Sequence, residues 1–295
     1  MNRKQAMQIV AGIESLPQIK KQLRAIIAAR PERIKLANTW QYHARKMLDW
    51  LDTDMRGPTP YRVFMPRGNT KLPFYAFSSL AIADCPGRGD CVNFCFSLKA
   101  WRYPAAFFRQ LQNSLLLRSG RHVIAAEFMA IPDGRELRLF VDGDFSSVEV
   151  VRFFMDLISA HPSLHVYGYS KSWREFLELD KAGYDWPRNY IVNKSSGSRW
   201  EDTETGKRFD ALPIVRDEFL AVKVDKKHIK SRAYQDKDNA GSKEYRAAVR
   251  HEMKAKLGKT KVFACPGNCG NCLPNGRHAC GSDDFRGIAI GIGVH

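Results

Sequence analysis

Three cysteines within eleven residues are the feature of this sequence most able to do chemistry. They follow an apolar, aromatic segment of strand character and lie on a stretch rich in glycine, proline and aspartate. They are Cys85, Cys91 and Cys95. Three thiolates on one loop can hold a soft metal ion or an iron–sulfur cluster and leave one coordination position open for chemistry. The alternative is ordinary packing of three buried thiols, or membership of a disulfide set.

A second group of four cysteines lies near the C-terminus. Its members are separated by glycine, proline and asparagine, which favour a tight, turn-rich knuckle. They are Cys265, Cys269, Cys272 and Cys280. Four thiolates suit structural zinc and a 4Fe–4S cluster equally well. His278 lies close enough in sequence to replace Cys280 as a ligand, although a solvent-facing neighbour is the more ordinary role for such a histidine.

The setting of these cysteines favours ligands over disulfides. Their number is odd, and no stretch has the length and apolar character of a membrane span or a signal peptide. We therefore expect a cytoplasmic protein that has no membrane partner and whose thiols stay reduced.

The net charge of +16 is concentrated in two segments. Residues 1–57 carry a net +6 and residues 223–261 a net +8. A concentrated basic surface favours a polyanionic partner, and nucleic acid is the simplest. The alternative is a solvated basic surface without a specific partner.

The elements between the two cysteine groups alternate between strand and helix. Apolar segments at 137–141, 164–169 and 190–192 have strand character, and each ends in polar residues before the next helix. Such a βα series predicts an α/β fold with a parallel sheet, whose site lies beyond the carboxyl ends of the strands. Those ends supply Asp142, Gly143, Asp144, Ser170, Lys171, Asn193, Lys194 and Ser195.

The remaining segments complete three predicted regions. Residues 1–57 form a basic helical module, residues 58–225 the βα core with the first cysteine loop, and residues 226–295 a basic segment with the cysteine knuckle. Within them we expect helices over 105–130, with a break near 119–120, and over 243–257. We expect an exposed connection over 199–211 and strands over 212–215 and 219–224.

The first cysteine loop resembles the cluster loop of radical S-adenosylmethionine (radical SAM) enzymes. Phe94 precedes the last cysteine of the loop, and Val141-Asp-Gly-Asp144 stands where that superfamily has its Gly/acid motif. The usual C-x3-C-x2-C spacing occurs at the second cysteine group, whereas the first is C-x5-C-x3-C. The resemblance implies a partial TIM barrel and a 4Fe–4S cluster whose open iron is chelated by S-adenosylmethionine.

The resemblance also implies roles for the strand-end residues. Asp142 and Asp144 would anchor the cofactor amine, with Gly143 between them. The cofactor carboxylate or ribose, or the substrate, would be contacted by Ser170, Lys171, Asn193, Lys194 and Ser195. We expect catalytic roles for Asp142, Asp144 and Lys171, and a second cluster or zinc at the C-terminal cysteines.

A longer part of the chain resembles the "gene product 88" family of phages and plasmids. The stretches that carry the resemblance are Leu72-Pro-Phe-Tyr-Ala-Phe, Cys95-Phe-Ser-Leu-Lys-Ala-Trp-Arg-Tyr-Pro104, Asp142-Gly-Asp-Phe145, Tyr167-Gly-Tyr-Ser-Lys171 and the cysteine knuckle. This resemblance implies a mobile-element context.

Three functions follow from these patterns. The first is an iron–sulfur enzyme of radical type that acts on or binds nucleic acid. The second is a non-catalytic regulator in which metal staples the fold and the basic surface binds nucleic acid or protein; Asp142 and Asp144 would then cap the following helix. The third, metal-dependent hydrolysis by Asp142, Asp144 and a histidine, ranks last because the histidines have no ligand spacing.

Overall fold

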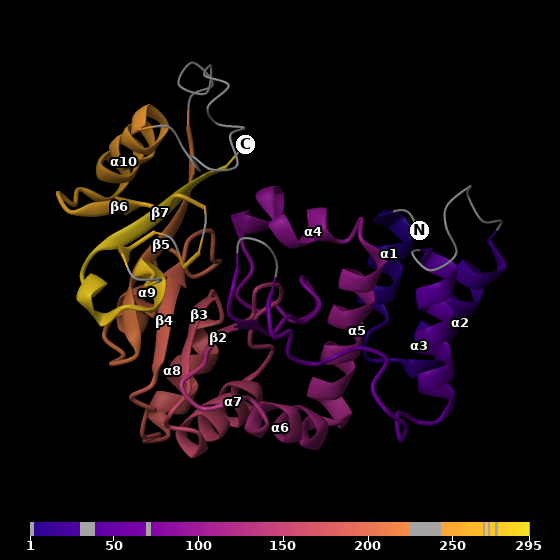
Figure 1. Ribbon diagram of the computed structural model, residues 1–295. Helices are drawn as coiled ribbons and strands as arrows, with labels where there is room; N and C mark the ends of the chain where they lie inside the picture. Colours follow the sequence, from indigo (N-terminus) through magenta and orange to yellow (C-terminus); the bar gives the residue numbers. More distant parts are fainter. Residues whose placement is uncertain are drawn as a thin grey trace.

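The computed structural model describes residues 3–29, 39–68, 72–224, 243–267, 269–270, 272–274 and 277–294. They form ten α-helices and seven strands, and all the strands belong to one sheet (Figure 1). Residues 225–242, which are part of the basic segment at 223–261, lie outside the described residues.

The elements alternate as the sequence predicts. The helices are α1 Arg3–Ala11, α2 Leu16–Ala28, α3 Trp40–Asp52, α4 Phe96–Ala100, α5 Pro104–Ser119, α6 Arg121–Met129, α7 Val148–Ala160, α8 Trp173–Lys181, α9 Glu204–Asp210 and α10 Lys243–Leu257. The strands are β1 Tyr75–Ala76, β2 Glu136–Leu139, β3 His165–Ser170, β4 Tyr190–Ser195, β5 Val215–Lys223, β6 Val262–Ala264 and β7 Ala289–Val294. Short 3-10 turns occupy Asp90–Phe94, Ala279–Gly281 and Asp283–Phe285.

The sheet is parallel throughout, which confirms the βα prediction. Its order is β1-β2-β3-β4-β5-β7-β6, so that β1 and β6 are its two edges. The first five strands are neighbours in chain order, as in a barrel, and the open sheet is consistent with a partial barrel.

Successive side chains of each strand point to opposite faces of the sheet. Leu137, Val166 and Val192 belong to the main hydrophobic core, which also contains the buried residues of α7 and α8. Leu220 and Val222 form a second core with α10. The intervening residues, such as Tyr167 and Tyr169, point to the opposite face of the sheet, here called the inner face. Three cysteines of the C-terminal group pack on this face: Cys265, Cys272 and Cys280.

The N-terminal helices are helical as predicted and share the main core. Buried side chains of α1, α2 and α3, including Ile9, Leu23 and Met47, belong to the same cluster as Phe77 under the sheet. Helix α3 packs on α5 (Figure 1). The break between α5 and α6 falls at Gly120, as expected.

Two local predictions are wrong. Residues 199–211 are not an exposed connection, because they include α9, whose Phe209 is fully buried and stacks on Trp173. The two predicted strands at 212–215 and 219–224 are one strand, β5. No helix in the described part of the chain is long and apolar enough to cross a membrane.

Candidate functional site

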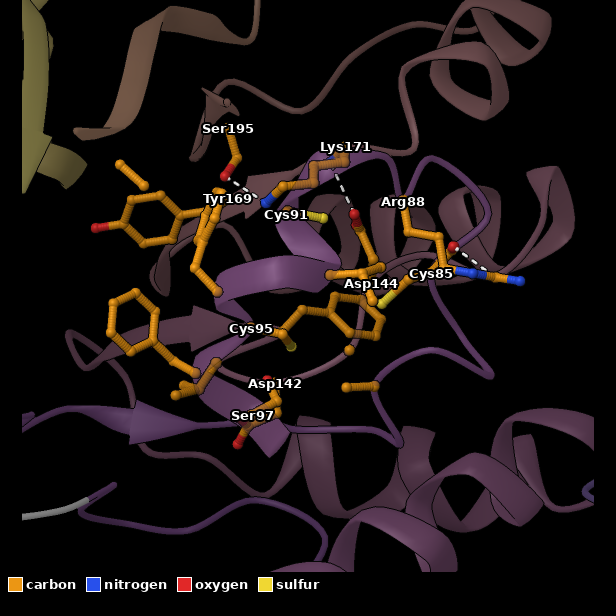
Figure 2. A pocket seen from close by; sticks show the side chains of 18 of the residues that line it. Cys85, Arg88, Cys91, Cys95, Ser97, Asp142, Asp144, Tyr169, Lys171 and Ser195 are labelled. Atoms are coloured by element: carbon orange, nitrogen blue, oxygen red, sulfur yellow. Dashed lines mark hydrogen bonds between the residues drawn. The ribbon is translucent and has the colours of Figure 1, made fainter. Parts of the chain in front are cut away.

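A cavity of about 190 Å³ opens where the first cysteine loop meets the carboxyl ends of the strands (Figure 2). A volume of ~10–15 Å³ on this measure holds one water molecule, so this space suits a much larger group. The cavity brings together eight residues that the sequence predicted: Cys85, Cys91, Cys95, Asp142, Gly143, Asp144, Lys171 and Ser195.

The cysteine loop is fixed to the strand ends by close backbone contacts. A Cβ at Gly87 would lie 1.6 Å from the carbonyl oxygen of Lys171. Gly197, with φ +77°, lets its chain pass so close to Cys91 that a Cβ would lie 2.9 Å from the Cys91 nitrogen. The Cys91 N–H donates to the Gly197 carbonyl at 3.2 Å. The loops after β3 and β4 therefore set the position of Cys91.

Asp84, the residue before the first cysteine, fixes the start of the loop to α5. Its carboxylate is fully buried and accepts from Arg118 Nη1 at 2.8 Å and from Ser114 Oγ, both on α5. Arg88 closes the loop from the other side by donating to the carbonyls of Ile82 and Cys85. The sequence analysis did not single out these anchors, because neither pairing is visible in the spacing of the residues.

Asp142 and Asp144 have different surroundings. The Asp144 carboxylate accepts from the N–H groups of Lys171 at 2.7 Å and Phe145 at 2.9 Å, and from Ser170 Oγ at 2.8 Å. It therefore ties the end of β2 to the end of β3. Asp142 accepts from the side chains of Gln110 at 3.0 Å and Ser78 at 3.3 Å.

Burial raises the pKa of both carboxyl groups. The rise for Asp142 is opposed by hydrogen bonds from Ser97, Ser78 and Gln110 and by the charge of Arg138. The rise for Asp144 is opposed by its bonds from Lys171, Phe145 and Ser170. The donors around each carboxylate favour its charged form and so oppose the effect of burial.

Lys171 extends from the end of β3 into the cavity. Its Nζ donates to Ser195 Oγ at 2.7 Å, as Figure 2 shows. Two backbone positions on the cavity wall are also unusual, since Ile82 and Phe140 have φ of +70° and +50°. Such values are rare for side chains of this size and are concentrated at functional sites.

Three predicted site residues lie outside the cavity. Ser170 is buried on the strand and bonds Asp144. Asn193 donates to the carbonyls of Gly168 and Cys280 and accepts from Arg216. Lys194 points toward the helices, where its Nζ contacts Asp210 of α9 at 2.7 Å. Lys194 points away from the cavity because residues 193–195 continue β4, in which neighbouring side chains alternate between faces.

The second cysteine group covers the inner face of the sheet. Cys265, Cys272 and Cys280 pack there with Tyr167 and Tyr169. Backbone N–H groups donate to two sulfurs, from Gly267 to Cys265 Sγ at 3.3 Å and from Ala279 to Cys272 Sγ at 3.4 Å. Burial raises the pKa of the Cys280 thiol to about 12, while a hydrogen bond from Tyr169 opposes the rise. Donors aimed at sulfur are typical of metal–thiolate centres.

A buried arginine, Arg216, and a half-buried one, Arg138, also face this group, and the sequence analysis missed both. Arg216 is 3% exposed and donates to Asn193 and to backbone carbonyls. Arg138 stacks on Tyr169 with its Cζ 4.5 Å from the ring centroid, and its buried Nε has no hydrogen-bond partner. Among the described residues neither guanidinium forms an ion pair with a carboxylate. Arg138 also lines the first cavity, so it lies between the two cysteine groups.

His278 anchors the knuckle through both nitrogens of its ring. Its Nδ1 accepts from the Gly281 N–H at 3.2 Å, and its Nε2 pairs with Glu136 at the start of β2. The ring is buried between Phe74 and Tyr167. This arrangement leaves neither nitrogen for a metal, so the structure does not favour His278 as a replacement for Cys280.

We therefore expect His278→Ala to weaken folding without removing a ligand. Loss of the buried ring and its two hydrogen bonds should lower the free energy of unfolding by about 2–3 kcal/mol. The metal bound per folded chain should stay at the wild-type value. Chemical denaturation and metal analysis of the folded fraction measure the two quantities, and a metal content reduced in that fraction would instead make His278 a ligand.

The sulfur atoms of each group share one region of the structure but do not converge on a single point. In the part of the chain that the structure describes, no three histidine, cysteine, aspartate or glutamate side chains converge at metal-binding separation. All seven cysteines are free thiols. The structure thus gives two shared environments, the cavity and the knuckle, in which the thiols of each group lie near one another.

Comparison with known proteins places the chain in a family. The family model described as gene product 88 matches residues 38–281, a span that includes both cysteine groups and every strand except β7. No curated protein and no solved structure matches the chain. Because the matched span is most of the sequence, the chain belongs to the gene product 88 family.

Proposed function

We propose that this chain is an iron–sulfur protein of a phage or plasmid, with a radical-SAM-like cluster in the cavity and a second metal centre in the knuckle. Cys85, Cys91 and Cys95 would hold the first cluster and leave one iron open. The four C-terminal cysteines would hold a second 4Fe–4S cluster or zinc. The family membership supports the phage or plasmid context.

The observation that carries the proposal is the pair of arginines beside the knuckle. Arg216 is buried, and Arg138 is half-buried with an Nε atom that is buried and unpartnered. In the described structure neither forms an ion pair with a carboxylate, and an unpaired charge removed from water is costly. With four neutral thiols, neither guanidinium group would have an anion in direct contact. Four thiolates around zinc or a 4Fe–4S cluster carry a net negative charge that the two guanidinium groups would offset. The donor set therefore fits a metal–thiolate centre.

The first cavity fits a cluster with an open position for different reasons. Its three thiols come from one loop that is fixed to the strand ends, and no fourth cysteine or histidine among the described residues lines the cavity. When bound, such a cluster supplies an iron that can bind and reduce a ligand. The cavity also holds fixed groups of both charges, so it suits a ligand with an amine and a carboxylate, such as S-adenosylmethionine.

The chain's own residues have distinct tasks in this proposal. The Asp142 carboxylate would accept a hydrogen bond from the amine of the ligand, because Gln110 and Ser78 hold that carboxylate at the cavity wall. Lys171 and Ser195 receive the carboxylate or ribose. Asp144 positions Lys171 through the backbone N–H of that residue. Asn193 and Lys194 support the sheet around the site.

Metal analysis of protein purified without oxygen tests the proposal. We expect about four or eight iron atoms per chain with equal sulfide, a brown colour, and binding of S-adenosylmethionine measured by calorimetry. Zinc without iron would contradict the radical-SAM-like function. That result would favour the alternative, a non-catalytic regulator stapled by metal.

Nucleic acid is the partner that the charge of the chain supports best. The basic helices α1, α2 and α10 contribute most of the excess charge that the structure describes. Binding through phosphate contacts should weaken steeply as salt concentration rises. Whether nucleic acid is substrate or only a binding partner depends on where it contacts the cavity.

A further inference from the structure

Exposed apolar side chains gather beside the first cavity. Among the described residues, five large hydrophobic side chains are exposed: Tyr42, Val92, Phe96, Tyr103 and Met129. Three of them lie within residues 92–103, the segment that contains Cys95 and α4. Phe96 is 49% exposed and Tyr103 is 57% exposed. Aromatic side chains that are left in solvent as a group indicate an interaction surface.

This surface is continuous with the cavity. Val92 and Phe96 both line the cavity and are both exposed, so they form part of its mouth. Phe96 follows Cys95 directly and begins α4, which Figure 1 shows between the sheet and the N-terminal helices. A molecule bound on this surface therefore lies beside the three cysteines.

Cations accompany both aromatic rings. Lys99 Nζ lies 5.4 Å from the centroid of Phe96, and Arg102 Cζ lies 5.1 Å from that of Tyr103. Both cations are exposed, and residues 88–103 hold three basic side chains against one acid, Asp90. Exposed rings with adjacent cations are the combination that binds single-stranded nucleic acid, since bases stack on the rings and phosphates pair with the cations.

We propose that Phe96, Lys99, Arg102 and Tyr103 form a platform for single-stranded nucleic acid at the mouth of the cavity. Bases stack on Phe96 and Tyr103, while Lys99 and Arg102 contact the flanking phosphates. A base held on Phe96 lies at the entrance to the cysteine cavity. This inference rests on the proposed function for its meaning, because it names the class of molecule that the cavity would act on.

Fluorescence anisotropy with a labelled oligothymidylate of about 20 nucleotides tests the platform. The double variant Phe96→Ala/Tyr103→Ala should weaken binding about tenfold or more, since each stacked base contributes ~1–3 kcal/mol. Lys99→Gln/Arg102→Gln should also weaken binding and reduce the slope of log K against log salt by about 1.4, which is ~0.7 for each lost phosphate contact. The aromatic variant should leave that slope unchanged.

The matched control is Tyr42→Ala/Met129→Ala, which removes two side chains that are each 47% exposed but lie elsewhere. It should bind the oligonucleotide like the wild type. Circular dichroism and thermal unfolding check that every variant is folded. Wild-type oligonucleotide affinity in the aromatic variant would overturn the proposal. If that variant also lost binding to phosphatidylserine vesicles, the surface would instead be a membrane contact.

Iron analysis of the purified protein, compared with the oligonucleotide affinity of the platform variants, separates this inference from the proposed function. If purified protein holds no iron but the platform variants still lose oligonucleotide affinity, the proposed cluster is wrong and the platform stands. If iron is present and the platform variants bind normally, the platform is wrong and the cluster stands.

Discussion

Cys91→Ala should lose the iron of the first cavity while keeping its fold. Cys91 is only half-buried, and the hydrogen bond from its backbone N–H to the Gly197 carbonyl does not depend on its side chain. The loop around it is held by Asp84, Arg88 and Gly87. We expect about four iron atoms fewer per chain, no binding of S-adenosylmethionine, and a free energy of unfolding within about 1 kcal/mol of wild type.

The neighbouring variant Val92→Ala is the control for this measurement. Val92 is exposed on the same short turn and lines the same cavity, but it offers no ligand atom. It should retain full iron. A Cys91→Ala protein that keeps all its iron would exclude the first cavity as the cluster site. One that unfolds would show that metal at this loop supports the fold, as the regulator hypothesis expects, because structural metal binding contributes directly to folding.

The carboxyl ends of the strands were the most predictable part of the site. Parallel strands bring their ends to one edge, so local polar motifs after β2 and β3 were enough to place Asp142, Asp144 and Lys171 in one cavity. The same reasoning misplaced Lys194, because the pattern ended the strand at Val192 whereas β4 continues to Ser195. An error of three residues in a strand end sends alternate side chains to the wrong face.

The relation between the two cysteine groups was not predictable. Nothing in the spacing of Cys265 to Cys280 shows that β6 and β7 exchange places at the edge of the sheet, or that the knuckle then covers the inner face beside Tyr167. Arg138 was overlooked for the same reason. In the sequence it is one polar residue within an apolar strand, and only the sheet shows that it lies between the two groups of thiols.

Gly87→Ala should strongly disrupt the loop that carries the cysteines of the first cavity. The added methyl group would lie 1.6 Å from the Lys171 carbonyl oxygen and 2.3 Å from its carbon, which are backbone atoms at the end of β3. They cannot move without disturbing Ser172 and the bond from the Lys171 N–H to Asp144. We expect the free energy of unfolding to fall by about 3 kcal/mol, measured by denaturation, or the cysteine loop to leave the strand end.

The two responses to Gly87→Ala differ in what they do to iron. If the loop moves, Cys85 is displaced from Cys91 and Cys95, so iron per chain falls while the unfolding transition changes little. If the loop stays, iron remains and stability falls. Gly57→Ala is the matched control, since its nearest neighbour is Thr53 Oγ1 at an ordinary 3.7 Å. A Gly87→Ala protein with wild-type stability and iron would show that the contact with Lys171 does not position the loop, and the cavity would then owe its shape to Asp84 and Arg88 alone.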